Sequence, residues 1–229
     1  MCCAADAALP FPDGAFAAVF CTDAFQYFAN KATSVRELRR LTQPAGFVLL
    51  NALPNARLQD THALLKRSGN SRPLPPEGYQ QLIADMPHCL VATRDVLGRY
   101  LRKQGPLLRR SGDLTPLADA PFVSLLASHR PEVFRAYGPL DEWPHAEGCL
   151  GVNPLYVHEG PKGPGTVRLR RTFPSRVYAQ EYVDDPEYLP ETVEVRAEVF
   201  PDLALGKRTP ELEGLLAQCV VLGLPLGYQ

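Results

Sequence analysis

The stretch from Asp6 to Asn51, DAALPFPDGAFAAVFCTDAFQYFANKATSVRELRRLTQPAGFVLLN, decides the fold of this chain. It contains two short apolar runs, Phe16–Cys21 (FAAVFC) and Phe47–Leu50 (FVLL), and turn residues precede each of them. Runs of this length, bounded by turn residues, are typical of strands buried on both faces of a sheet. We therefore predict two buried strands at these positions.

An amphipathic helix is predicted between the two runs. Val35, Leu38 and Leu41 recur at a spacing of three, and charged residues separate them, so they form one apolar stripe. We expect Ser34 to cap this helix, with Glu37 reaching back to the cap. Strand, helix and strand with short links predict a parallel crossover unit, which is almost always right-handed.

The composition of the 229 residues is that of a globular protein. Hydrophobic residues make up 45% and charged residues 21%, which suits a packed core. The net charge of -1 gives no electrostatic reason to expect nucleic acid as a partner. No apolar run reaches about 18 residues, so we expect no membrane span, and the acidic start is unlike a secretory signal.

The six cysteines are scattered and form no C-x-x-C pair, so we expect no metal site. Reduced thiols are the simplest interpretation, and they suit a cytoplasmic protein.

Taken in order, the motifs of the opening stretch resemble the second half of a class I S-adenosylmethionine-dependent methyltransferase domain of the type 11 kind. The matching positions are Asp6, Leu9-Pro10-Phe11, Phe16, Val19, Glu37-Leu38, Leu41, Pro44 and Gly46. The chain departs from the usual pattern twice. Ala17 stands where the family usually has Asp, and Ala45 stands where it usually has the first Gly of a pair.

The resemblance implies a truncated Rossmann-like α/β fold with a mostly parallel sheet, and S-adenosyl-L-methionine as cofactor. It implies cofactor contacts from Asp6, Ala7, Cys21 and Thr22, and contacts to the methyl acceptor, which we expect to be a small molecule, from Phe25 and Tyr27. A turn-capping role for Asp6 and simple packing of the two aromatic residues are the alternative interpretations. The resemblance identifies no catalytic base.

Residues 1–54 are thus expected to be the methyltransferase core, and residues 55–147 a helical insertion over the ligand end of the sheet. Helical periodicity recurs in the insertion at residues 56–67, 78–86, 90–104 and 122–137. Its basic cluster is Arg99, Arg102, Lys103, Arg109 and Arg110, which fits either attraction of an acidic acceptor or a solvated helix face.

Residues 148–229 are expected to add an antiparallel hairpin at the edge of the sheet, then a strand and a helix. The hairpin strands are predicted at Cys149–Glu159 and Thr166–Phe173, with the turn at Gly160–Gly165. A further strand is predicted at Glu191–Phe200, and Thr209 is predicted to cap the last helix.

In the resembled family, a glycine-rich loop and a ribose-binding acid precede the Asp-Ala turn, and nothing before Asp6 can supply them here. The pattern at Gly160–Gly165 is unsuited to an anion cradle, because its prolines lack N–H donors. Three hypotheses stay open at this point. The chain is the C-terminal portion of a methyltransferase, with a truncated gene product as one explanation; it is a non-catalytic remnant or binding module; or a second chain supplies the missing strands.

Overall fold

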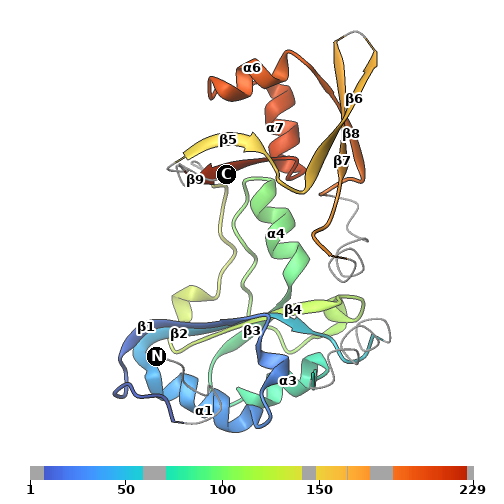
Figure 1. Cartoon of the computed structure of the whole chain (residues 1–229). Helices are drawn as coiled ribbons and strands as arrows, with labels where there is room; N and C mark the ends of the chain where they lie inside the picture. Colours follow the sequence, from blue (N-terminus) through green and yellow to red (C-terminus); the bar gives the residue numbers. More distant parts are fainter. Residues whose placement is uncertain (1–7, 59–70, 141–147, 164, 176–187, 226–229) are drawn as a thin grey trace. The chain divides into compact units, whose positions relative to one another are not determined.

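The computed structural model describes residues 8–58, 71–140, 148–163, 165–175 and 188–225 (Figure 1). Its contacts divide the chain into two compact units. The first comprises residues 1–100 and 104–139, and the second comprises residues 101–103 and 140–229. The described residues form one sheet in the first unit and two in the second, and each unit has a hydrophobic core of its own.

The first unit contains the predicted crossover. Strand β1 (Phe16–Thr22), helix α1 (Lys31–Leu41) and strand β2 (Thr42–Pro54) follow one another, with the short 3-10 turn η1 (Phe25–Tyr27) after β1. The two strands are parallel neighbours. The α/β class and the parallel crossover are therefore confirmed.

The other two strands of this sheet run antiparallel to their neighbours. Strand β4 (Phe122–Ser128) pairs with β2, and β3 (His88–Ala92) pairs with β4, so the order is β1-β2-β4-β3. The parallel pairing that the sequence predicted is thus present between β1 and β2, whereas the other two pairs of this sheet are antiparallel. Because β3 and β4 come from residues 55–147, that segment is not helical throughout.

The helix predicted over residues 122–137 is wrong. Residues 123–128 are all buried, since β4 lies between β2 and β3. A buried strand is apolar on both faces and cannot be distinguished from a buried helix by periodicity. The helix predicted over residues 90–104 is replaced by the end of β3 and by α4 (Thr93–Leu101). Helix α3 (Pro76–Leu82) lies where one was expected, whereas most of the helix predicted at 56–67 lies outside the described residues.

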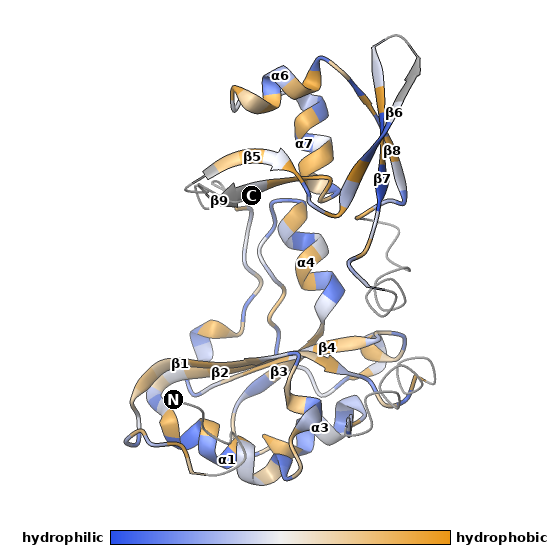
Figure 2. Ribbon diagram, in the orientation of Figure 1, coloured by the Kyte–Doolittle hydropathy of each residue, from blue (hydrophilic) through white to orange (hydrophobic). Residues whose placement is uncertain are grey.

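Helices α1 and α3 lie on the same side of this sheet (Figure 1). They enclose a core with β2, β4 and η1, whose largest fully buried side chains include Phe25, Leu50, Leu53, Tyr79, Ile83 and Leu125. Figure 2 shows β1 and β2 as apolar over most of their lengths. The hydrophobic stripe predicted on α1 is confirmed, because Val35, Leu38 and Leu41 are buried.

The predicted cap of α1 is wrong. The helix begins at Lys31, and its cap is Asn30, four residues before Ser34. The Asn30 side chain accepts a hydrogen bond from the Thr33 amide at 3.1 Å. The Ser34 hydroxyl instead donates to the Asn30 carbonyl at 3.0 Å. The apolar stripe begins at Val35, after the first helical turn, so its spacing could not show that the helix begins at Lys31.

Strand β1 is not buried on both faces as predicted. Val19 and Cys21 pack against the core, but Phe20 is 71% exposed and Phe16 is 37% exposed. Phe20 lies between Val19 and Cys21, so its side chain points to the opposite face of the strand, away from the core. In the described sheet β1 is also an edge strand, which pairs with β2 on one side.

The second unit contains two antiparallel sheets. Strand β5 (Gly148–Val152) pairs with β9 (Val221–Pro225), and β6 (Tyr156–Gly163), β7 (Thr166–Arg171) and β8 (Thr192–Arg196) form the other sheet. The predicted hairpin exists as β6–β7, but it does not join the first sheet as expected. The strand predicted at Cys149–Glu159 is divided in two around Pro154, which cannot donate to a ladder.

Two short helices cover the core of the second unit, α6 (Val199–Ala204) and α7 (Pro210–Ala217). The predicted start of α7 is confirmed, because Thr209 Oγ1 accepts from the Leu212 amide at 3.3 Å. The strand predicted at Glu191–Phe200 is shorter than expected, since α6 begins at Val199.

Candidate functional site

The carboxyl ends of β1 and β2 meet at one edge of the first sheet. Thr22 stands beside Asn51 in the ladder, and the Asp23 amide donates to the Asn51 carbonyl at 3.1 Å. In open α/β sheets, ligands bind outside the carboxyl ends of parallel strands. This edge is therefore the candidate site.

A polar network that the sequence analysis missed fixes Asn51. The Ser124 hydroxyl donates to Asn51 Oδ1 at 2.6 Å and lies 2.9 Å from Thr93 Oγ1. The network joins the end of β2 to β4 and to the start of α4. One indication of this network was present in the sequence, because Asn51 directly follows the apolar run Phe47–Leu50. Ser124 was hidden because it lay in a segment predicted as a helix.

Both strand ends also carry a non-glycine residue in the left-handed region. Asp23 has φ 49° and Ala52 has φ 53°. Such conformations cost on the order of 1–3 kcal/mol and cluster at functional sites. Ala52 lies where the register of β2 against β4 shifts, so the strain accompanies a local irregularity of the strand.

The loop after β1 is held from within. Gln26 is fully buried, and its amide donates to the Asp23 carbonyl at 3.1 Å and to Asp23 Oδ1 at 3.0 Å. Gln26 Oε1 is buried and has no hydrogen-bond partner among the described residues. The Lys31 ammonium donates to the carbonyls of Gln26 and Phe28, and its pKa is lowered, first by burial and then by the charge of Arg72.

Of the predicted cofactor contacts, Thr22 is exposed at the end of β1 and Cys21 is half-buried. Burial raises the pKa of the Cys21 thiol, so the side chain is a small neutral lining group rather than a nucleophile. Asp6 and Ala7 lie outside the described residues.

The predicted acceptor contacts differ from one another. Tyr27 is 46% exposed, so its ring is open to a ligand. Phe25 has no exposed surface and packs against Phe28 and Tyr79, with ring centroids 5.6 Å and 6.3 Å away. The Phe25 side chain therefore belongs to the core and does not face an acceptor as predicted. In TDAFQYF, Phe25 and Tyr27 stand two residues apart, but the 3-10 turn sends them in different directions.

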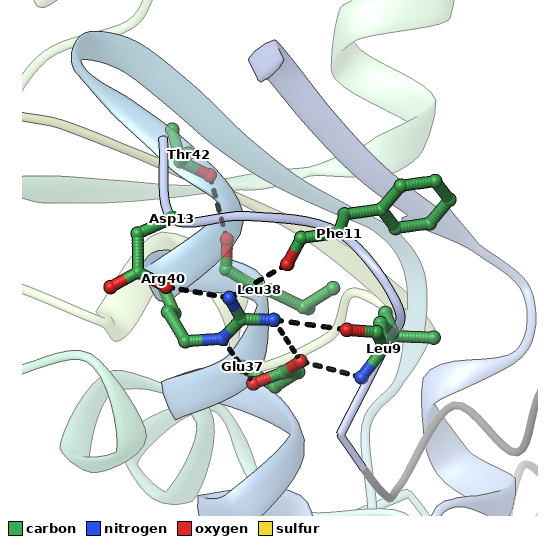
Figure 3. Close-up of polar contacts among 7 residues, drawn as sticks. All are labelled: Leu9, Phe11, Asp13, Glu37, Leu38, Arg40 and Thr42. Atoms are coloured by element: carbon green, nitrogen blue, oxygen red, sulfur yellow. Dashed lines mark hydrogen bonds and ion pairs between the residues drawn. The ribbon is translucent and has the colours of Figure 1, made fainter. Parts of the chain in front are cut away.

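The loop that leads into β1 is clamped by two side chains of α1 (Figure 3). Glu37 accepts from the Leu9 amide at 2.7 Å and from Arg40 Nη2 at 2.6 Å and Nε at 2.8 Å. Arg40 also donates to the carbonyls of Leu9 (3.2 Å) and Phe11 (2.9 Å) and to Asp13 Oδ1 (2.6 Å). These contacts use all five N–H donors of the guanidinium.

The clamp makes a prediction for the dependence of stability on pH. Hydrogen bonds from Arg40, and then from the Leu9 amide, lower the pKa of Glu37 to about 2. Because this pKa lies below the unfolded value of about 4.3, the ionised carboxylate stabilises the fold above that value, and this contribution is lost as pH falls towards 2. The difference in unfolding free energy between the wild type and Glu37→Gln, from urea denaturation, should therefore shrink between pH 6 and pH 3. A difference independent of pH would contradict the ion pair.

Two surface cavities lie elsewhere in the first unit, with volumes of about 510 Å³ and 520 Å³. The first is lined around Met86, His88 and Arg110, and the second around Arg39, Thr42 and His129. Both lie near the start of β2 or β3, whereas Cys21 and Thr22 lie beside the end of β2. Neither cavity is lined by a predicted site residue.

Three residues of the basic cluster predicted from the sequence contact other parts of the chain. Arg99 donates to the Gly105 carbonyl at 2.8 Å, Lys103 pairs with Glu213 at 3.0 Å, and Arg110 stacks over the Phe134 ring. Within the part of the chain that the structure describes, no three His, Cys, Asp or Glu side chains gather as metal ligands. In the same residues, no helix has the length and apolarity to cross a bilayer.

Comparison with known proteins finds a family match for the opening segment. Residues 1–50 match the family described as "Methyltransferase domain", in agreement with the resemblance predicted from the sequence. A curated relative, malonyl-[acyl-carrier protein] O-methyltransferase of Erwinia pyrifoliae, is 37% identical over 67 residues. The match covers 29% of this chain and 26% of the relative, so the chain spans about a quarter of the relative's length.

Solved structures overlap the chain in part. A possible histamine N-methyltransferase of Thermotoga maritima is 13% identical with a TM-score of 0.39, and the match covers 55% of this chain and 61% of that one. A geranyl diphosphate C-methyltransferase of Streptomyces coelicolor is 17% identical with a TM-score of 0.40, covering 56% of this chain and 51% of that one.

Proposed function

We propose that this chain is the C-terminal portion of an S-adenosylmethionine-dependent methyltransferase. The observation that supports the proposal most strongly is the parallel β1–α1–β2 unit, which lies within a segment of the methyltransferase domain family except for the last residues of β2. Its strand ends present an exposed hydroxyl at Thr22 and an exposed ring at Tyr27 beside the strained backbone of Asp23. These groups fit one side of a nucleoside ligand.

We assign cofactor contacts to Asp6, Ala7, Thr22 and the lining surface of Cys21, and an acceptor contact to Tyr27. The described residues hold no glycine-rich loop at a helix start, so they supply only part of the contacts that such a cofactor needs. The cofactor supplies an activated methyl group on a sulfonium. The role of the chain is to orient it and exclude water, and alignment of donor and acceptor can contribute about 7–11 kcal/mol.

The reaction is in-line transfer of the methyl group to an oxygen, nitrogen or carbon nucleophile of a small acceptor. The new bond forms from the nucleophile's electron pair as the carbon–sulfur bond breaks and sulfur keeps its electron pair. A carboxylate acceptor has no proton to lose, whereas a protonated nucleophile releases its proton to solvent. The relative from Erwinia suggests the first acceptor to test, a malonyl group carried by an acyl-carrier protein.

The test is a transfer assay with methyl-labelled S-adenosylmethionine on the full native gene product. The acceptor panel contains malonyl-acyl-carrier protein, free malonate, and small phenols and amines. We expect label on one acceptor class and S-adenosylhomocysteine as the second product. Absence of transfer to every acceptor would contradict the proposal.

A second candidate is a non-catalytic binding module that retains the fold without the cofactor site. The burial of Phe25 favours it, because one of the two predicted acceptor contacts is unavailable. Calorimetric titration with S-adenosylmethionine separates the candidates, since tight binding by residues 1–229 alone would exclude the module.

We also propose that a second chain covers the edge of β1. The strand FAAVFCT carries no charge, and Phe20 is 71% exposed on it. Uncharged apolar edge strands are prone to pairing with other chains. We therefore propose two partners, the small-molecule methyl acceptor and the second chain at the edge of β1.

Phe20→Glu is expected to weaken that association. A charge on the edge opposes strand pairing, so the variant should sediment more slowly than the wild type at equal concentration. The matched control is Leu205→Glu, because Leu205 is 70% exposed in the second unit. A wild-type chain that sediments as a monomer at all concentrations would contradict the proposed partner.

A further inference from the structure

The side chains of Thr22 and Asn51 are neighbours at the carboxyl ends of β1 and β2. Cys21 and Leu50 form the preceding pair of the parallel ladder, and both pack on the core side of the sheet. Because successive side chains of a strand point to opposite faces, Thr22 and Asn51 share the other face. Neighbouring strands lie about 4.7–4.9 Å apart, so about one strand spacing separates these two polar positions.

Two hydroxyl groups fix the orientation of the Asn51 amide. Ser124 is buried, and its Oγ lies 2.6 Å from Asn51 Oδ1, which is within the range of O–H···O hydrogen bonds and shorter than that of N–H···O bonds. The single hydroxyl proton of Ser124 is used in this bond. Thr93 Oγ1, 2.9 Å away, therefore donates its own proton to Ser124 Oγ. The donors run from Thr93 through Ser124 to Asn51 Oδ1.

This arrangement leaves the amide nitrogen of Asn51 available. In the part of the chain that the structure describes, no oxygen accepts a hydrogen bond from Asn51 Nδ2, and the residue is half-buried. With Oδ1 held by Ser124, the side chain is a directed donor with two N–H groups. The groups that it can bind are oxygens with free lone pairs, such as those of a carbonyl or a carboxylate.

We propose that Asn51 binds the methyl acceptor by donating through Nδ2 to one of its carbonyl or carboxylate oxygens. Ser124 and Thr93 are the positioning residues that direct it. The inference rests on the proposed function, in which Thr22 contacts the cofactor. Methyl transfer needs the reacting atoms about 3–3.5 Å apart, so the acceptor must lie against the cofactor. A donor one strand spacing from Thr22 is within reach of an acceptor in that position.

Two variants separate binding from positioning, and a third is their control. Asn51→Asp keeps the size of the side chain and an acceptor for Ser124, but it removes both N–H donors. Ser124→Ala keeps the donors and removes the hydroxyl that directs them. Ser128→Ala is the matched control, because Ser128 is also buried on β4 and donates to the Gly46 carbonyl at 2.9 Å, towards the opposite end of β2. Both serine variants lose a buried hydrogen bond, but only one of these bonds directs Asn51.

The experiment measures steady-state methyl transfer by the full native gene product and these three variants. The probe is the acceptor of the panel above that takes up most label, and malonyl-acyl-carrier protein is tested first. We expect the KM of the acceptor to rise about tenfold in Asn51→Asp and about threefold in Ser124→Ala, as for a lost hydrogen bond. It should change less than about twofold in Ser128→Ala, as should the KM of S-adenosylmethionine in all three. The Tm of the two serine variants should fall by similar amounts.

The outcomes are distinct. An unchanged acceptor KM in Asn51→Asp, or an acceptor that has no carbonyl or carboxylate oxygen, would overturn the binding role and leave the proposed function standing. An equal rise in Ser124→Ala and Ser128→Ala would overturn the positioning role, because the effect would then come from weakening β4 in general. A matching rise in the KM of S-adenosylmethionine would place Asn51 at the cofactor instead and overturn the inference. Transfer to no acceptor would refute the proposed function, and this inference with it.

Discussion

Replacing Leu50 with alanine is expected to lower the free energy of unfolding by about 2–5 kcal/mol. Leu50 is 1% exposed and lies on the face of β2 that packs against α1 and α3. Removing its three distal carbons forfeits their transfer energy and leaves a cavity between the sheet and the helices. Urea denaturation followed by circular dichroism measures the loss.

Leu49→Ala is the control for this prediction, because it makes the same chemical change one position earlier in the same strand. Successive side chains of a strand point to opposite faces, and Leu49 is only partly buried. We expect a clearly smaller loss there. Equal losses at Leu49 and Leu50 would contradict the placement of Leu50, and not Leu49, on the core face of β2.

Gly46→Ala is expected to lower the free energy of unfolding by about 1–3 kcal/mol, the typical cost of overpacking. A Cβ atom at Gly46 would lie 2.6 Å from the Ala17 carbonyl oxygen and 2.8 Å from Thr42 Cγ2. The first of these atoms belongs to the backbone of β1, so the strand itself must shift. The parallel pairing of β1 with β2 therefore depends on this glycine.

Gly138→Ala is the control for this second prediction, since a Cβ atom there meets no atom within 4 Å. We expect its unfolding free energy to stay within about 0.5 kcal/mol of the wild type. Thermal and urea unfolding of both variants measure the difference. A Gly46→Ala variant as stable as Gly138→Ala would show that β1 does not approach β2 so closely.

The crossover unit was predictable because local signals agreed there. The spacing of Val35, Leu38 and Leu41, the turn residues and the two apolar runs all indicated one arrangement. The environment of β1 was not predictable, because the sequence of an apolar strand does not show which of its two faces other elements cover. The same run of residues therefore gave the right strand and the wrong burial for Phe20.

The rest of the fold depended on contacts distant in sequence. Strand β4 was predicted as a helix, since Val123–Ser128 is buried on both faces and has no alternation to read. Of the candidate site, the strand end at Thr22 followed from the motif. The Asn51–Ser124 contact joins residues 73 positions apart and needed the pairing of β2 with β4. The clamp was also missed, because the sequence shows that Glu37 and Arg40 are charged but not that the loop at Leu9 lies beside them.

The proposed function requires that a nucleoside cofactor binds where the carboxyl ends of β1 and β2 meet. Photo-cross-linking with an azido-adenosyl analogue of S-adenosylmethionine tests it most directly, followed by trypsin digestion and mass spectrometry. The first Lys or Arg of the chain is Lys31, so residues 1–31 are released as one peptide that contains Asp6, Thr22 and Tyr27. We predict label on this peptide, suppressed by excess S-adenosylhomocysteine. Label that resists competition, or that falls on peptides from residues 140–229, would contradict the claim.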